Sequence, residues 1–137
     1  MSDQNDLWAS ALAVREHAYA PYSTHRVGAA IIDEHDRLHV GCNVENAAYP
    51  AGNCAETSAI AAMIAAGGRR IKAIAVAGGV DGIDVCTPCG GCRQRMSEFA
   101  DAQTRVWLAD GNGGLTEHTV QELLPAGFSL KADSEGQ

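Results

Sequence analysis

The sequence predicts an α/β fold in which helices cover both faces of a sheet of about five strands. Segments with helical spacing of apolar residues alternate with short strand-like runs, and this alternation is typical of a sheet packed between helices. Residues 71–77 form a nearly continuous apolar run, as expected for a central strand buried on both faces. The 137 residues suffice for one core, so we expect residues 1–137 to form a single domain.

The N-terminal part predicts a helix followed by a β-hairpin. Residues 6–19 carry apolar side chains at helical spacing, including Trp8 and Tyr19, which we expect in the core. Residues 27–32 and 38–43 are strand-like and lie on either side of a short polar turn. This arrangement predicts an antiparallel strand pair.

Two more helices are predicted, one before and one after the central strand. Residues 54–66 are rich in alanine and are followed by Gly67 and Gly68, which favour a helix end. Residues 89–100 predict the second of these helices, and the preceding Pro88 suits its first turn. The small side chains of the first helix allow it to pack closely on its neighbours.

The C-terminal part completes the predicted sheet. Residues 105–108 predict a short strand, and a glycine-rich turn at 110–114 leads to a final strand and a helix that ends at Pro125. These two strands, the hairpin and the central run give the five expected strands. We expect the last residues, 131–137, to form a disordered tail.

Composition and charge argue against several classes of function. Ten Lys and Arg residues face seventeen Asp and Glu residues, and the net charge of −7 does not suit a surface that binds nucleic acid. No apolar run approaches the ~18 residues that a membrane span needs. The first residues lack the basic and apolar parts of a signal peptide. We therefore expect a soluble cytoplasmic protein whose cysteines are thiols.

Three of the five cysteines open the two predicted central helices. Cys54 begins the first, and Cys89 and Cys92 begin the second, where their spacing places them on one side of the helix. Unpaired backbone N–H groups and the positive end of the helix dipole stabilise thiolates, which bind zinc. If the two helix starts face each other, three thiolates hold the metal and leave one position open. That open position indicates a catalytic zinc site, in which a bound water is acidified.

Glu56 is the candidate proton shuttle of this site. It lies two residues after Cys54, and at the end of a helix both side chains can approach a metal placed near the helix axis. The Cys54 sulfur would contact the metal, and the carboxylate would contact the water. A carboxylate in that position can take a proton and later deliver it to a leaving group.

Cys86 leaves two alternatives open. As a fourth ligand it would make the zinc site structural, because structural sites have four protein ligands. Its three-residue spacing from Cys89 also resembles an iron–sulfur run, but in that pattern a proline follows a fourth cysteine, whereas here Pro88 comes before Cys89. Cys42 lies in a hydrophobic strand and is expected to be a buried thiol.

A cysteine, any residue, a glutamate and a later Pro-Cys-x-x-Cys form the zinc deaminase pattern in its all-cysteine variant, and this chain contains it. Together with further matches over nearly the whole chain, the pattern resembles the small, homotetrameric, zinc-dependent cytidine deaminases. The matching segments are VGAA at 27–30, GCNVENAAYP at 41–50, CAE at 54–56, PCGGCRQ at 88–94 and ELLP at 122–125.

The resemblance implies a three-layer α/β/α cytidine-deaminase-like fold with a mixed, roughly five-stranded sheet. It further implies a zinc enzyme of pyrimidine salvage that hydrolyses cytidine and deoxycytidine to uridine and deoxyuridine and releases ammonia. By similarity, Cys54, Cys89 and Cys92 hold the zinc and Glu56 shuttles protons. The expected partners are a small pyrimidine nucleoside and three further copies of the chain, with neither nucleic acid nor membrane involved.

The resemblance also assigns substrate contacts. Asn43 and Glu45 match the positions that grip the ribose 3′ hydroxyl, and the backbone of Ala55 matches one that helps to hold the base. His25 stands where the family usually has a phenylalanine that packs on the base. Phe128 resembles an aromatic residue that reaches the active site of a neighbouring subunit.

Two positions depart from the family pattern. Thr57 stands where an arginine commonly follows the glutamate and offsets the thiolate charge; the helix dipoles or an inward-turning Arg93 or Arg95 are the candidate replacements. His25 adds hydrogen-bonding capacity to the pocket. The alternative substrates are therefore a modified cytidine or a blasticidin-type antibiotic, and the alternative from another class is a noncatalytic zinc-binding module.

Overall fold

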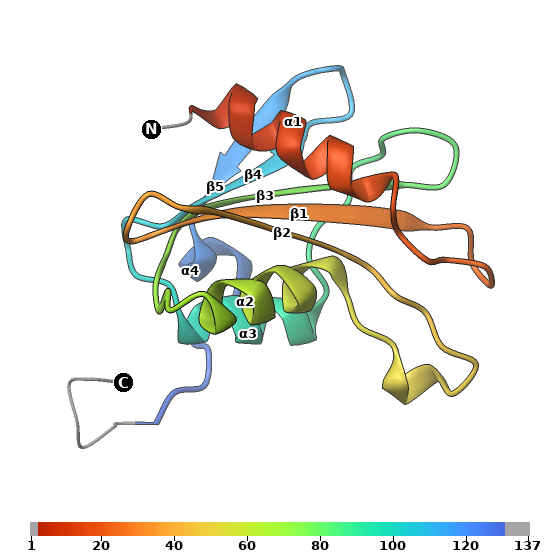
Figure 1. Ribbon diagram of the computed structural model, residues 1–137. Coiled ribbons are helices and arrows are strands. Elements are labelled where there is room, and N and C mark those ends of the chain that lie inside the picture. Colours follow the sequence, from red (N-terminus) through yellow and green to blue (C-terminus); the bar gives the residue numbers. More distant parts are fainter. Residues whose placement is uncertain (1–2, 131–137) are drawn as a thin grey trace.

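A mixed five-stranded sheet forms the centre of the computed structural model, which describes residues 3–130 (Figure 1). The strands lie in the order β2-β1-β3-β4-β5; β3 and β4 are parallel, and the other neighbours are antiparallel. The predicted hairpin and central strand are therefore confirmed. The strands are β1 Arg26–Asp33, β2 Leu38–Cys42, β3 Ile71–Gly79, β4 Arg105–Ala109 and β5 Leu115–His118.

Helices cover both faces of this sheet, so the predicted three-layer α/β/α architecture is also confirmed. Figure 1 shows α1 on one face, and α2, α3 and α4 on the other. Within residues 3–130 no helix is long and apolar enough to cross a membrane. The helices are α1 Gln4–Arg15, α2 Ala55–Ala65, α3 Gly90–Glu98, α4 Val120–Leu123 and the short 3-10 helix η1 Tyr49–Ala51.

The core has two parts because alternate residues of a strand face opposite sides of the sheet. In β1, Ala30 packs in the part that includes Leu7 of α1. Its neighbour Ile31 packs in the part that includes Met63 of α2 and Met96 of α3. The sheet therefore fixes α2 and α3 together on the same face.

Two glycines let the helices approach the sheet at backbone distance. A Cβ on Gly28 would lie 2.1 Å from the carbonyl oxygen of Ala11 in α1. A Cβ on Gly41 would lie 2.3 Å from the backbone nitrogen of Ala59 in α2. Neither position has room for a side chain. The close packing predicted for the alanine-rich helix is thus present where α2 crosses β2.

The first helix is shorter than the predicted range 6–19. It begins after Asp3, whose side chain accepts a hydrogen bond from a helix N–H at 3.0 Å. It ends at Arg15, whose guanidinium donates to the carbonyl oxygens of Gly79 and Gly82 at 2.9 and 3.1 Å. These bonds attach the end of α1 to the last residue of β3 and to the loop that follows it.

Two local predictions are wrong, and one lies outside the described residues. Tyr19 is 55% exposed because it falls beyond the helix end, where its backbone pairs with Val44 in an isolated bridge. Pro88 is not in the first turn of a helix, since Cys89 is the N-cap of α3. Residues 131–137, expected to be a disordered tail, lie outside the described range.

A buried carboxylate holds the β1–β2 hairpin. Asp33 is fully buried, and its Oδ2 lies 2.7 Å from Nε2 of His39 and 3.1 Å from Nε of Arg37. Its Oδ1 accepts the backbone N–H groups of His35 and Arg37. Burial alone raises the pKa of Asp33, but these hydrogen bonds together hold it well below its usual range.

We expect this carboxylate to make the protein sensitive to acid. Its folded pKa lies below its ordinary value of 3.8, so its contribution to stability is present above about pH 4 and is lost as the pH falls through the folded value. Asp33→Asn should lower the free energy of unfolding at pH 7 by about 1–3 kcal/mol, the cost of unsatisfied buried partners. Urea unfolding between pH 7 and pH 2 measures both effects.

The matched control is Asp81→Asn, because Asp81 is exposed. Equal stability losses in the two variants at pH 7 would contradict the role assigned to Asp33.

Candidate metal centre and its pocket

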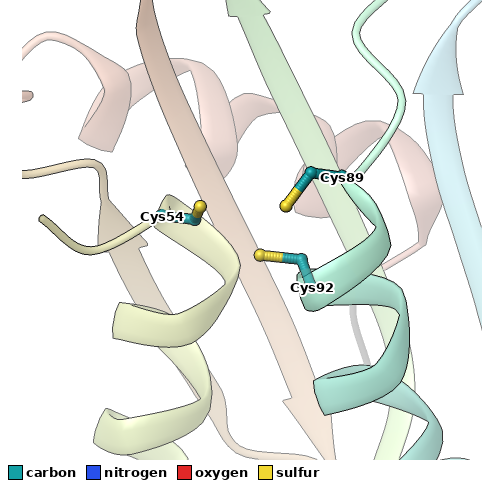
Figure 2. Close-up of side chains that lie close together, drawn as sticks. All are labelled: Cys54, Cys89 and Cys92. Atoms are coloured by element: carbon teal, nitrogen blue, oxygen red, sulfur yellow. The ribbon is translucent and has the colours of Figure 1, made fainter. Parts of the chain in front are cut away.

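The structure brings together the three cysteines that the sequence singled out. Cys54 is the N-cap of α2, Cys89 is the N-cap of α3, and Cys92 lies in the first turn of α3. Their sulfur atoms all lie within 4.8 Å of one another. Figure 2 shows the three side chains pointing into the space between the two helix starts.

The three thiols differ in acidity. The backbone N–H of Cys92 faces the Cys89 sulfur and lowers the pKa of Cys89. Burial raises the pKa of Cys54 and that of Cys92. Cys89 is thus the first of the three to become a thiolate. A metal that binds here releases the protons that the three thiols still carry.

The donor set fits zinc. Three thiolates at two helix starts are soft, negatively charged ligands, which zinc prefers. Within residues 3–130, the grouped metal-binding side chains are these three cysteines. Three protein ligands leave a fourth position for water or substrate, as in catalytic zinc sites.

Cys86 lies beside the three-cysteine group without joining it. Its sulfur lies 3.7 Å from Nε2 of His25, and burial raises the pKa of Cys86 to about 11. The ligand atoms that lie within 4.8 Å of one another are the sulfurs of Cys54, Cys89 and Cys92, and the Cys86 sulfur is not among them. The alternatives of a four-cysteine structural zinc and of an iron–sulfur cluster therefore lack their fourth ligand in this arrangement.

Glu56 is buried beside the thiols, with 4% of its surface exposed. Burial raises its pKa, and the Cys92 thiol and the Arg95 guanidinium counteract part of that rise. Because burial raises its pKa, this carboxyl group holds a proton more readily than an exposed glutamate does and can pass it on. The position fits the proton shuttle that the sequence predicts.

A pocket of about 560 Å³ opens above the three-cysteine group. Asn43, Glu45, Ala55 and His25, the substrate contacts expected from the sequence, all line it. Phe128 does not line it, because its side chain is 68% exposed and its carbonyl oxygen accepts from Nε2 of Gln94 elsewhere. Sequence reasoning assigned no role to six further polar or aromatic lining residues, namely Tyr22, Ser23, Asn46, Tyr49, Asn53 and Thr87.

Asn43 and Glu45 hold the loop that carries His25. Asn43 accepts from the backbone N–H of Val27 and donates to the carbonyl oxygen of His25, both at 2.8 Å. Glu45 accepts from the backbone of Tyr22 at 2.9 Å. The Ser23 hydroxyl also donates to Glu45 and is the main cause that lowers its pKa. The carboxylate is therefore ionised and faces the pocket as an acceptor.

Thr57 and Arg93 do not supply a cation to the metal centre. The Thr57 hydroxyl lies 3.8 Å from the Cys92 sulfur and is neutral. The Arg93 guanidinium donates to the carbonyl oxygens of Pro88 and Leu123 at 2.7 and 2.8 Å. Arg93 therefore fixes the start of α3 against the end of α4.

The fold and the site together define an α/β protein with a three-thiol metal centre that opens into a pocket. Comparison with known proteins identifies the family of the chain. The chain belongs to a zinc-binding deaminase family, because residues 1–108 match the family model described as the cytidine and deoxycytidylate deaminase zinc-binding region.

Individual relatives agree with this assignment. The chain is 42% identical to a cytidine deaminase of Sporosarcina psychrophila over 127 residues, which cover 93% of this chain and 92% of the relative. It is 37% identical to a cytidine deaminase of Mycobacterium tuberculosis H37Rv over 134 residues, 93% of this chain and 91% of the relative. A crystal structure of cytidine deaminase from Burkholderia pseudomallei superposes with a TM-score of 0.84 at 40% identity, covering 93% of this chain and all of that one.

We expect Cys89→Ala to lose the metal while Cys86→Ser keeps it. Groups that only surround the ligands change metal affinity by up to about 100-fold. Removing one of the three ligands themselves should weaken zinc binding by more than that. The midpoint of thermal unfolding should fall as well, since bound metal stabilises the folded state. Zinc content after buffer exchange, measured by mass spectrometry, tests both variants. A Cys89 variant that keeps one zinc per chain would refute the three-thiol site.

Proposed function

We propose that this chain is a cytidine deaminase, which hydrolyses cytidine and deoxycytidine to uridine and deoxyuridine and releases ammonia. The observation that carries the proposal is the group of three sulfurs within 4.8 Å of one another, beside a buried glutamate and under an open pocket. Relatives with this name are 42% identical over most of the chain.

In the proposed reaction, the metal activates water and the carboxyl group of Glu56 transfers protons. Cys54, Cys89 and Cys92 hold zinc, which when bound supplies a Lewis acid that makes water a better nucleophile. Glu56 takes a proton from the attacking water and delivers it to the exocyclic nitrogen of the base, which leaves as ammonia. The raised pKa of Glu56 suits both steps, since it makes the carboxylate a better proton acceptor than an exposed glutamate.

The pocket supports a neutral nucleoside as substrate. None of its lining residues in the described chain is a lysine or an arginine, so it offers no cationic cradle for a phosphate group. In the proposal, Asn43 and Glu45 bind the ribose 3′ hydroxyl, and the backbone of Ala55 holds the base. His25 lies against the base, and Phe128 contributes to the pocket of a neighbouring subunit.

One observation favours a second candidate substrate. The imidazole of His25 and the thiol of Cys86 lie 3.7 Å apart and make one wall of the pocket polar. A polar wall can form hydrogen bonds to a substituent on the base. The second candidate is therefore a modified cytosine nucleoside, including a blasticidin-type antibiotic.

We also propose that residues 1–137 form one domain that assembles as a homotetramer and works in pyrimidine salvage in the cytoplasm. Several large apolar side chains are exposed. Among them are Leu38 and Val40 of the edge strand β2, Tyr49 of η1 and Phe128. Exposed apolar surface of this kind favours association with other copies. Family resemblance supplies the number of subunits.

The zinc-loaded protein should release ammonia from cytidine and deoxycytidine, and Glu56→Gln should remove that activity. Loss of a proton shuttle lowers turnover by about 100- to 10,000-fold. The variant should still bind one zinc per chain, because the three thiols are unchanged. An ammonia assay run beside a zinc measurement separates the two effects.

The substrate panel for this assay includes cytosine, adenosine and modified cytidines. Release from a modified cytidine alone would favour the second candidate, with His25→Phe expected to restore cytidine turnover. No release from any compound by a protein with full zinc content would contradict deamination and favour a noncatalytic zinc protein.

Sedimentation velocity should show one species with four times the 14.3 kDa chain mass. Val40→Glu should dissociate it, because a charge would be buried where an apolar side chain of the edge strand meets another copy. Val85→Glu is a matched control, since Val85 is also exposed but lies in a loop. A monomer at micromolar concentration would contradict the assembly.

A further inference from the structure

The proposed metal centre carries a negative charge that needs a cation nearby. Zinc with three thiolates has a net charge of −1, and Glu56 adds a second negative charge when it ionises. A negative centre retains zinc less well unless positive groups lie around it, because thiolates that repel one another are protonated more easily. This inference rests on the metal site of the proposed function.

A second cleft is lined by Thr57, which is a neighbour of the metal centre. It has a volume of about 430 Å³ and lies between α2 and α3. Thr57 lines this cleft and also contacts the Cys92 sulfur at 3.8 Å. The small threonine therefore leaves space for another side chain to approach the thiols. The other lining residues are Ile60, Ala61, Gln94, Arg95, Glu98 and Phe99.

Arg95 is placed to bring positive charge to this space. A Cβ built on Gly91 would lie 3.0 Å from Nη1 of Arg95 and 4.0 Å from the Cys89 sulfur, so the guanidinium and the thiol lie on the same side of α3. The guanidinium also attracts the buried carboxylate of Glu56. It is therefore within electrostatic reach of both the sulfurs and the proton shuttle.

The guanidinium of Arg95 is not held by another group among residues 3–130, so it can approach the metal centre. No hydrogen bond or ion pair of its guanidinium to another group is found among residues 3–130, whereas Arg93 is bound to two carbonyl oxygens. Glu98 lines the same cleft and is the acidic group that competes for Arg95. Glu98 is exposed, so water weakens that attraction.

We propose that Arg95 is a positioning residue that supplies the positive charge balancing the three-thiolate zinc centre, through the cleft that Thr57 leaves open. Arg95 is itself exposed, which limits the strength of the interaction. We expect its removal to weaken zinc binding by roughly tenfold, the lower end of the effect of groups around metal ligands.

The test compares zinc dissociation constants, measured at pH 7 by competition with a chromophoric zinc chelator. Arg95→Gln should raise the constant roughly tenfold, and adding Thr57→Arg to that variant should restore it, because the new guanidinium would enter the same cleft. Arg70→Gln removes the same charge from an exposed residue beyond the opposite end of α2 and should change nothing.

Thermal unfolding of each zinc-loaded variant verifies that it is folded. Equal affinities of the parent and Arg95→Gln would overturn the proposal, and so would an equal loss in Arg70→Gln, which would show a general effect of net charge. A parent that binds no zinc would overturn the metal site as well. A parent that binds zinc tightly through Arg95 but releases no ammonia would contradict only the proposed deamination.

Discussion

The site depends on two helices beginning within thiol reach of each other. Three sulfurs lie within 4.8 Å of one another only because α2 and α3 lie side by side on one face of the sheet (Figure 1). The close approach of α2 to β2 at Gly41 fixes the position of its first residue. The same geometry aims two sets of unpaired backbone N–H groups at the thiols and buries Glu56 between the helices.

The site also depends on positive groups that balance the negative charge of its thiolates and carboxylate. The centre concentrates sulfur and carboxylate groups in a protein whose net charge is already −7. Three positive groups lie near this negative charge. They are the partial charges of the helix starts, the backbone N–H of Cys92, which lowers the pKa of Cys89, and the guanidinium of Arg95, which lowers the pKa of Glu56. The pocket above remains free of lysine and arginine among its described lining residues. The positive groups named here therefore lie at the metal centre, and the described pocket lining contains none.

Sequence patterns predicted the features that depend on local spacing. The three strands around the centre, the starts of α2 and α3 and the convergence of Cys54, Cys89 and Cys92 follow from periodicity and from cysteines placed at helix starts. Features that depend on distant contacts were missed or misplaced. The guanidinium of Arg15, at the end of α1, binds carbonyl groups at the end of β3 and in the loop after it. The choice between Arg93 and Arg95 depends on which guanidinium finds carbonyl partners.

The most direct test of the account is the coordination of the bound zinc, measured by X-ray absorption at the zinc edge. We expect three sulfur neighbours at about 2.3 Å and one oxygen or nitrogen neighbour, the pattern of a centre with an exchangeable position. Four sulfur neighbours would contradict it. In that case Cys86 would have to move away from His25 to complete a structural site, and the pocket would have no open metal position beneath it.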